Sequence, residues 1–241
     1  MAWVRSDDDG HTWSKPTPIL TLKEHWAYWG PICLTQDGRW GFCPYFEEIP
    51  AKGKSVRTYS MLMWSEDQGR TWSEPIEFPK TADGNRGLTE MTVAQLGPRH
   101  YFAAIRADDT VGSWDGFYWS ESTNGLQWSV PESFGERGRM PLIYQLKDGW
   151  ALAYRQYDAD KGVQHSAIRF SSDGRQWANP QLIETGVGAM PQLVELAGRI
   201  IVFNNGCPDG GMVTRHVVPA RAVHPEASPQ SGHEGSRVPT L

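Results

Sequence analysis

Arginine, carboxylate and aromatic side chains that could do chemistry recur where short apolar runs of the chain begin or end. The candidates are Glu90, Arg106, Asp108, Arg139, Arg155, Tyr28, Trp29 and Tyr157. Arginine outnumbers lysine 16 to 7, and its planar guanidinium binds a carboxylate through two parallel hydrogen bonds. A codon bias toward arginine would give the same ratio. Together with aromatic rings that could stack on a sugar, these side chains suit a site for an acidic carbohydrate. For Tyr28 and Trp29, packing inside the fold is the favoured alternative.

A short sequence motif typical of a tight turn occurs four times in nearly identical form. It indicates which elements position these residues. It occupies residues Ser6–Trp13, Ser65–Trp72, Ser122–Trp128 and Ser171–Trp177, and its tryptophans recur every 49 to 59 residues. A period of this size means that one supersecondary unit is repeated. In each turn the Asp or Asn can accept backbone hydrogen bonds and the Gly can adopt a positive φ. The turns are therefore predicted to be structural, and their aspartates are not expected to be catalytic.

A second repeated sequence motif predicts another hairpin in each unit. It covers residues Pro31–Arg39, Met91–Arg99, Pro141–Gly149 and Pro191–Arg199, each followed by an apolar run. Each unit then has four antiparallel strands, which we call A to D, with the repeated turn between C and D. Such units arranged radially form a β-propeller, and no segment indicates a helix. In that fold the starts of A and the ends of B share the rim opposite the turns.

The chain ends interrupt this pattern. Residues 1–20 supply only strands C and D, and residues 189–206 supply only A and B, with three whole units between them. Either the ends pair to close a fourth unit, or the chain is a piece of a larger ring. The propeller is predicted to span residues 1–215. Residues 216–241, rich in Pro, Ser, Gly, His and Glu, are predicted to be disordered.

Composition excludes several classes of function. The net charge of −5 gives no general attraction to nucleic acid or to an anionic membrane. No apolar run approaches the roughly 20 residues of a membrane span, and no signal peptide opens the chain. The histidines have no metal-ligand spacing, and there is no Gly-rich phosphate loop, so we expect neither metal nor cofactor. Cys33 and Cys43 could pair across one hairpin, but two free thiols are the favoured interpretation.

The repeated turn resembles the Asp box, or BNR repeat, of the sialidase (neuraminidase) superfamily, and residues 1–206 resemble that superfamily throughout. Asp boxes also occur in other propellers. The resemblance implies six blades, of which this chain looks like about four. It also implies a retaining glycosidase with a Tyr nucleophile, a partner Glu, an Asp acid/base and three Arg residues that hold the substrate carboxylate.

The segment from Leu88 to Arg106 looks like the family segment in which a Glu opens strand A and the second Arg closes strand B. The resemblance thus assigns catalytic roles to Glu90 and Arg106, whose alternative is a salt bridge at a strand end. The first of the three substrate-binding Arg residues is expected at a position before residue 1 of this chain. The third is expected within residues 162–165, where no Arg stands, so Arg139 and Arg155 are the nearest substitutes. Met190 stands where the Tyr nucleophile is expected, and Asp108 and Glu47 are the guesses for the acid.

Three hypotheses follow from these residues. The first is a sialidase-like exo-glycosidase that removes a terminal acidic sugar from a carbohydrate partner, with a lyase of uronic-acid glycans as a close variant. The second is a non-catalytic propeller that binds glycan or protein. The third is a truncated, inactive fragment.

Overall fold

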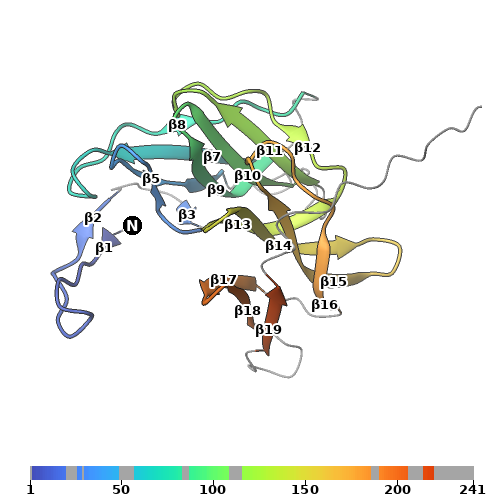
Figure 1. Cartoon of the computed structure of the whole chain (residues 1–241). Helices are drawn as coiled ribbons and strands as arrows, with labels where there is room; N and C mark the ends of the chain where they lie inside the picture. Colours follow the sequence, from blue (N-terminus) through green and yellow to red (C-terminus); the bar gives the residue numbers. More distant parts are fainter. Residues whose placement is uncertain are drawn as a thin grey trace, which may run out of the picture.

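The computed structural model describes residues 2–19, 26–28, 30–48, 57–82, 87–108, 116–185, 190–205 and 214–219. Within these ranges the chain is all-β, which confirms the predicted fold class. Three large antiparallel sheets follow one another around an arc, with a small sheet at each end (Figure 1). The described part of the chain contains no helix long and apolar enough to cross a membrane.

The three large sheets correspond to the three predicted whole units. Sheet 1 comprises β3 (Trp26–Tyr28), β4 (Cys33–Leu34), β5 (Trp40–Phe42), β6 (Pro44–Glu48), β7 (Arg57–Ser65) and β8 (Ile76–Glu77). Sheet 2 comprises β9 (Gly87–Gly97), β10 (His100–Asp108), β11 (Gly116–Ser122) and β12 (Glu132–Ser133). Sheet 3 comprises β13 (Arg137–Leu146), β14 (Gly149–Asp158), β15 (Val163–Ser171) and β16 (Gln181–Thr185). In sheet 1 the predicted strands A and B are each divided in two.

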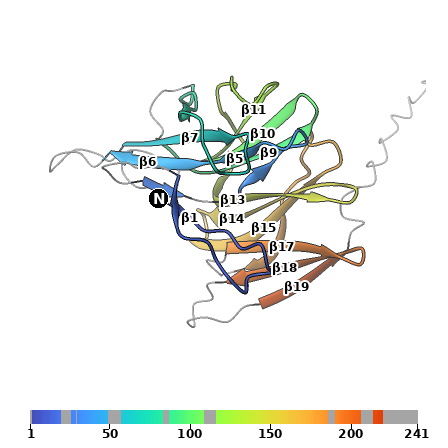
Figure 2. The same cartoon turned by 90° about the vertical axis from the view of Figure 1, so that its left-hand side faces the viewer.

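The small sheets lie at the two ends of the arc. The N-terminal hairpin pairs β1 (Ala2–Trp3) with β2 (Thr17–Pro18). The C-terminal sheet contains β17 (Met190–Leu196), β18 (Arg199–Asn205) and β19 (Thr214–Pro219). The described strands of these two sheets do not pair with each other, so the arc is not closed there. Figure 2, viewed from the side of the hairpin, shows β17–β19 below β13–β15.

The third strand of the C-terminal sheet differs from the sequence-based prediction, which had two strands in this unit. β19 pairs with β18 in the register Ile201↔Val217, and it runs past residue 215, the predicted end of the propeller. The β-branched residues Val217 and Val218 favour a strand where composition favoured disorder. Residues 220–241 lie outside the described residues.

Apolar side chains form core layers between sheets 1 and 2, between sheets 2 and 3, and between sheet 3 and the C-terminal sheet. Residues central to these layers are Leu62, Trp64, Val93 and Ile105 between sheets 1 and 2, Phe102, Phe117, Leu152 and Tyr154 between sheets 2 and 3, and Ile168, Phe170, Leu193 and Val202 between sheet 3 and the C-terminal sheet. Fully burying one such side chain stabilises the fold by about 1.5–3 kcal/mol. This layering holds the sheets side by side and fixes which strand ends meet.

The repeated turns have the structural role predicted for them. In the second turn the backbone N–H of Gly69 donates to Ser65 Oγ at 2.7 Å, and the Thr71 N–H donates to Asp67 Oδ1 at 2.8 Å. Hydrogen bonds from Thr71 lower the pKa of Asp67 to about 2. Trp72 Nε1 donates back to the Gly69 carbonyl at 3.1 Å. The aspartate is thus committed to organising the turn.

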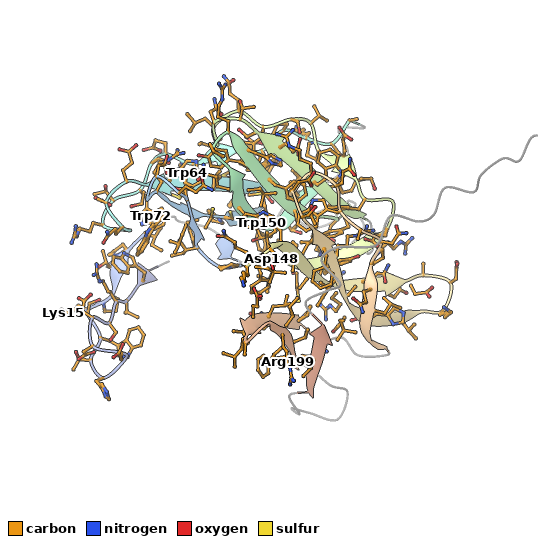
Figure 3. The ribbon with its side chains drawn as sticks, in the orientation of Figure 1. Lys15, Trp64, Trp72, Asp148, Trp150 and Arg199 are labelled. Atoms are coloured by element: carbon orange, nitrogen blue, oxygen red, sulfur yellow. The ribbon has the colours of Figure 1, made fainter. Side chains whose placement is uncertain are left out.

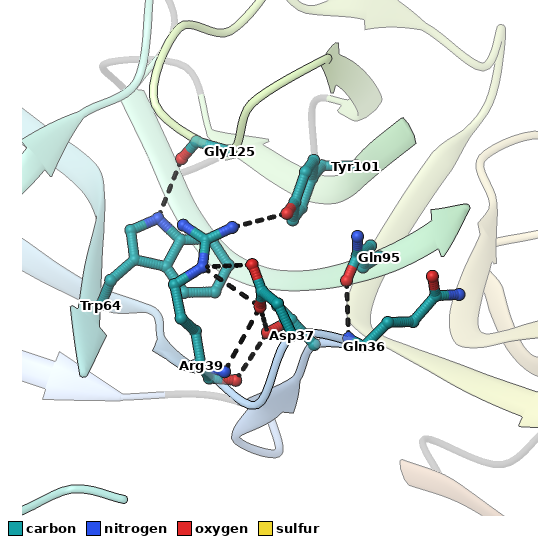
Figure 4. A network of polar contacts seen from close by, with 8 residues as sticks. Gln36, Asp37, Arg39, Trp64, Gln95, Tyr101 and Gly125 are labelled. Carbon is teal, nitrogen blue, oxygen red and sulfur yellow. Dashed lines mark hydrogen bonds and ion pairs between the residues drawn. The ribbon is translucent and has the colours of Figure 1, made fainter. Parts of the chain in front are cut away.

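At the same end of the molecule a polar network locks sheet 1 to sheet 2 (Figure 4). Arg39 is held by Asp37 and donates to Tyr101 Oη at 2.6 Å, and its guanidinium lies 4.8 Å from the Trp64 ring centre. Trp64 Nε1 donates to the Gly125 carbonyl at 2.9 Å. Figure 3 labels Trp64, which lies in β7 of sheet 1, and Trp72, which lies in the repeated turn after that strand.

The thiols of Cys33 and Cys43 are both free and buried, which confirms the favoured interpretation of these two cysteines. Burial raises the pKa of the Cys33 thiol to about 12 and raises that of Cys43 well above its ordinary value. Because the thiolate is the reactive form, these cysteines are inert in the folded protein.

Candidate active site

Glu90, Arg106 and Asp108 form one ion-pair cluster at the end of sheet 2 opposite its repeated turn. Glu90 lies near the start of β9, and Arg106 and Asp108 lie at the end of the neighbouring strand β10. Between the pairs Ile105↔Met91 and Ala107↔Leu88 the register breaks, so that Thr89 and Glu90 form a bulge of β9 opposite Arg106. Such a bulge re-aims a side chain at the edge of a sheet.

The geometry of the cluster is tight. Arg106 Nη1 lies 2.9 Å from Glu90 Oε1. On its other side, Arg106 Nε lies 2.9 Å from Asp108 Oδ1 and Nη2 lies 2.8 Å from Asp108 Oδ2, a bidentate pair. The side chains of Glu90, Arg106 and Asp108 are 7%, 17% and 18% exposed. The guanidinium is therefore fixed between two carboxylates at a partly buried position.

Sheet 3 contributes a backbone donor to the same cluster. The N–H of Met140 donates to Glu90 Oε2 at 2.9 Å. Met140 lies in a bulge of β13 and has φ of 55°, a left-handed conformation that is strained for a residue with a side chain. Each oxygen of Glu90 thus accepts a hydrogen bond from a different sheet. No sequence signal marked Met140, because its contribution is a backbone group.

Arg139 and Arg155 bring further positive charge to this place. They are directly paired between β13 and β14. Burial, and then the positive charge of Arg106, lowers the pKa of Arg139 to about 10, against the effect of Asp108 and Glu90. Burial also lowers the pKa of Arg155, which Glu90 opposes. Met140, the next residue after Arg139 in β13, donates its N–H to Glu90, so this arginine pair of sheet 3 lies beside the cluster of sheet 2.

Burial shifts the pKa of Asp108 in the opposite direction to the pKa of the two arginines. It raises the pKa of Asp108 above its ordinary value, and the positive charge of Arg106 opposes that rise. Counting Glu90 and Asp108 against Arg106, Arg139 and Arg155, the five groups have a formal net charge of +1 when all are ionised. This net positive charge favours the binding of an anion at the site.

For the remaining candidate site residues the structure describes only part of the position or surroundings. Tyr157 lies at the same end of sheet 3, opposite Arg137 in the register, and the Arg137 guanidinium lies 5.8 Å from the ring centre. The backbone of Tyr28 belongs to β3, but its side chain lies outside the description, as does that of Glu47 in β6. Trp29 lies outside the described residues altogether. Met190 opens β17, opposite Asn205.

A second polar cluster, between sheets 2 and 3, was missed by sequence reasoning. Tyr154 Oη donates to Glu136 Oε1 at 2.6 Å, and Arg169 Nη2 donates to the same oxygen at 2.7 Å. Gln156 Nε2 donates to Glu136 Oε2 at 2.6 Å. Burial, and then the charge of Glu136, raises the pKa of Tyr154. Tyr154 has no exposed surface, so this Tyr–Glu pair supports the contact between sheets rather than chemistry on a substrate.

Among the described residues no group of three or more His, Cys, Asp or Glu side chains could hold a metal ion. The acidic side chains of the site are instead engaged with arginine. What the arrangement can do chemically is bind and orient an anion.

Solved structures with the same fold include three informative ones. A protein of unknown function from Dyadobacter fermentans has a TM-score of 0.70 at 18% identity, over 88% of this chain and 61% of that one. A Hadza microbial sialidase has a TM-score of 0.63 at 16% identity, over 80% of this chain and 44% of that one. The sialidase of Trypanosoma rangeli, in complex with sialic acid, has a TM-score of 0.57 at 14% identity, over 91% and 40%.

This chain therefore spans less than two thirds of the length of these structures, and at such identities the likeness shows the fold. No curated protein matches the sequence. The family model described as BNR repeat-like domain matches residues 1–187, well over half of the chain. The protein thus belongs to the BNR repeat-like domain family, as a propeller structurally related to glycoside hydrolases.

Proposed function

We propose that this chain carries the binding rim of a sialidase-like exo-glycosidase that hydrolyses a terminal acidic sugar from glycans. The observation that carries the proposal is the gathering of Arg106, Arg139 and Arg155 with Glu90 and Asp108 at one end of two adjacent sheets. The family and the sialidases among its structural relatives support the same class of substrate.

The charges favour a carboxylate ligand. Arg139 and Arg155 lie side by side in the register, and like charges at partly buried positions destabilise each other. A bound carboxylate would relieve that repulsion and could accept hydrogen bonds from both guanidinium groups. Arg106, already held by two carboxylates, would orient the ligand rather than supply all of its binding energy.

The two acidic groups have different environments and so different proposed roles. Glu90 accepts hydrogen bonds on both oxygens and would act as a base or as the charge partner that keeps Arg106 in place. Asp108, whose pKa is raised by burial, would be the group that holds a proton for the leaving sugar. An anionic sugar would repel a carboxylate nucleophile, so neither group is proposed to attack the substrate.

Release of a fluorogenic leaving group from a sialoside tests the proposal. We expect turnover by the wild-type chain and strong loss in Arg106→Ala and Glu90→Gln. If both variants keep full turnover, or if a longer homologous propeller with these residues gives none, the proposal is wrong. An unsaturated product from a uronic-acid glycan would identify the lyase variant instead.

A second candidate is a non-catalytic propeller that binds glycans through the same rim. It is favoured by Met190 at the position expected for the Tyr nucleophile. Binding on a glycan array with no hydrolysis of any bound sugar would support it, and detectable hydrolysis would exclude it. A chain that neither binds nor melts cooperatively would be an inactive fragment.

A further inference from the structure

Six side chains of sheet 3 form two parallel rows on one face of its successive strands β13, β14 and β15. The strand register places Arg139, Arg155 and Ser166 side by side, which we call the first row. It also places Arg137, Tyr157 and Gln164 side by side, which we call the second row. Residues two apart in a strand share a face, so the two rows lie about 7 Å apart on the same face.

The two rows continue the face of sheet 3 that packs on the C-terminal sheet. Ala153 of β14 belongs to that packing layer, and by alternation Arg155 and Tyr157 follow on the same side. The opposite face is closed by sheet 2 at this level. A Cβ atom on Gly138, which lies between the two rows, would come within 2.7 Å of Phe117 Cγ. The rows are therefore directed away from sheet 2.

The first row contains the arginine pair that the proposed function assigns to the substrate carboxylate, Arg139 and Arg155. Its third member, Ser166, donates through Oγ to Asn204 Oδ1 at 2.9 Å, so the C-terminal sheet reaches as far as this row. The second row lies two residues further along each strand, beyond this contact. All three of its side chains are partly exposed.

The second row has groups suited to an acidic sugar unit of its own. The Arg137 guanidinium lies 5.8 Å from the Tyr157 ring centre, a cation–π contact that orients it. In the described part of the chain Arg137 makes no ion pair, so no carboxylate there neutralises its charge. Gln164 Oε1 is buried and has no hydrogen-bond partner among the described residues. Such an acceptor is costly to leave unsatisfied, and a sugar hydroxyl would satisfy it.

We propose that the second row binds a second anionic sugar unit, so that the ligand of this rim is a glycan with two neighbouring acidic units. The six side chains of the two rows include three arginines and no carboxylate. A ligand with a single carboxylate fills the first row and leaves Arg137 without a counter-charge, whereas a second carboxylate about 7 Å away supplies one. The inference rests on the proposed function, since it takes Arg139 and Arg155 as the site of the first acidic unit.

Calorimetric titration of the full chain with one-acid and two-acid probes tests this proposal. One pair of probes is the methyl glycoside of sialic acid and a sulfur-linked disialic acid, which a glycosidase does not cleave. The other pair is galacturonic acid and its dimer. We expect the dimer of one of these sugars to bind about tenfold or more tightly than its monomer, because Arg137 adds a charge-assisted contact. The pair that shows this preference identifies the class of acidic sugar.

Three variants locate the preference in the second row. Arg137→Gln should weaken binding of the dimer about tenfold and leave binding of the monomer unchanged, and the unchanged monomer affinity shows that the first row is still folded. Arg137→Lys keeps the charge without the guanidinium fork and should keep part of the preference. Arg175→Gln is the matched control, since Arg175 is exposed in the repeated turn at the opposite end of sheet 3. It should bind both probes as the wild type does.

Arg139→Gln separates failure of this proposal from failure of the proposed function. If monomer and dimer bind equally and Arg139→Gln weakens both, the first row binds an acid and only the second-row site is overturned. If no probe binds, or if Arg139→Gln changes the binding of none, the proposed function fails and the second-row site fails with it. A control variant that loses the preference as fully as Arg137→Gln would also overturn the second-row site.

Discussion

Replacing Glu90 with Gln probes the centre of the candidate site without changing its shape. Glu90 Oε1 accepts from Arg106 and Oε2 accepts from the Met140 N–H, so a Gln amide must turn its NH₂ group toward one of these two donors. One hydrogen bond to a charged group is lost, which destabilises a protein by about 1.5–3 kcal/mol. Arg106 keeps its bidentate partner Asp108, so the larger loss of about 3–5 kcal/mol for a fully unpaired buried charge does not apply.

Urea denaturation and thermal melting measure this loss. In a chain of this size each kcal/mol lowers Tm by about 2–4 °C. Glu132→Gln on the exposed strand β12 is the matched control and should lie within about 0.5 kcal/mol of the wild type. If Glu90→Gln is no more destabilised than this control, the conclusion that both Glu90 oxygens accept stabilising hydrogen bonds is refuted. If it is destabilised as expected yet turns over a sialoside normally, only the catalytic role fails.

Two further predictions concern the scaffold. In the cluster between sheets 2 and 3, Tyr154→Phe removes the hydrogen bond donated to Glu136 and the longer one, 3.2 Å, accepted from Arg169 Nε, which is also held by Glu136. This variant should cost about 1.5–3 kcal/mol. Glu136→Gln leaves Arg169, 10% exposed, without its partner charge and should cost more. Equal losses in denaturation, or the reverse order, would contradict this account. In the second repeated turn, the pKa of Asp67 is about 2 in the folded state against an ordinary value of 3.8, so its contribution to stability is complete above the ordinary value and is lost as the pH falls through the lower one. Tm measured against pH should therefore fall less steeply in acid for Asp67→Asn than for the wild type, and parallel curves would refute the role of Thr71 as donor.

The repeated turns and the strand pattern could be predicted because both depend on short-range chemistry. The hydrogen bonds that fold the second turn link residues at most four apart, such as Thr71 with Asp67. Alternation along a strand likewise depends only on neighbours, since successive side chains point to opposite faces of a sheet. The approach of Glu90 to Arg106 was also within reach, because the two residues lie on strands joined by one tight turn.

Other parts of the site depend on contacts between sheets, and no local pattern marks them. Met140 meets Glu90 through a backbone N–H fifty residues away. Glu136, just before β13, meets Tyr154 and Arg169 because β13, β14 and β15 pair side by side in sheet 3. The strand β19 was missed because the residues before it break the apolar pattern, and its pairing with β18 is a tertiary outcome.

The sequence by itself thus determined the repeating unit, its turns and the all-β class, since these follow from residue spacing and from hydrogen bonds within a few residues. Only the tertiary structure decided which strand ends meet and which charges share one rim. Those features follow from strand register and from the packing of one sheet on the next, which join residues far apart along the chain.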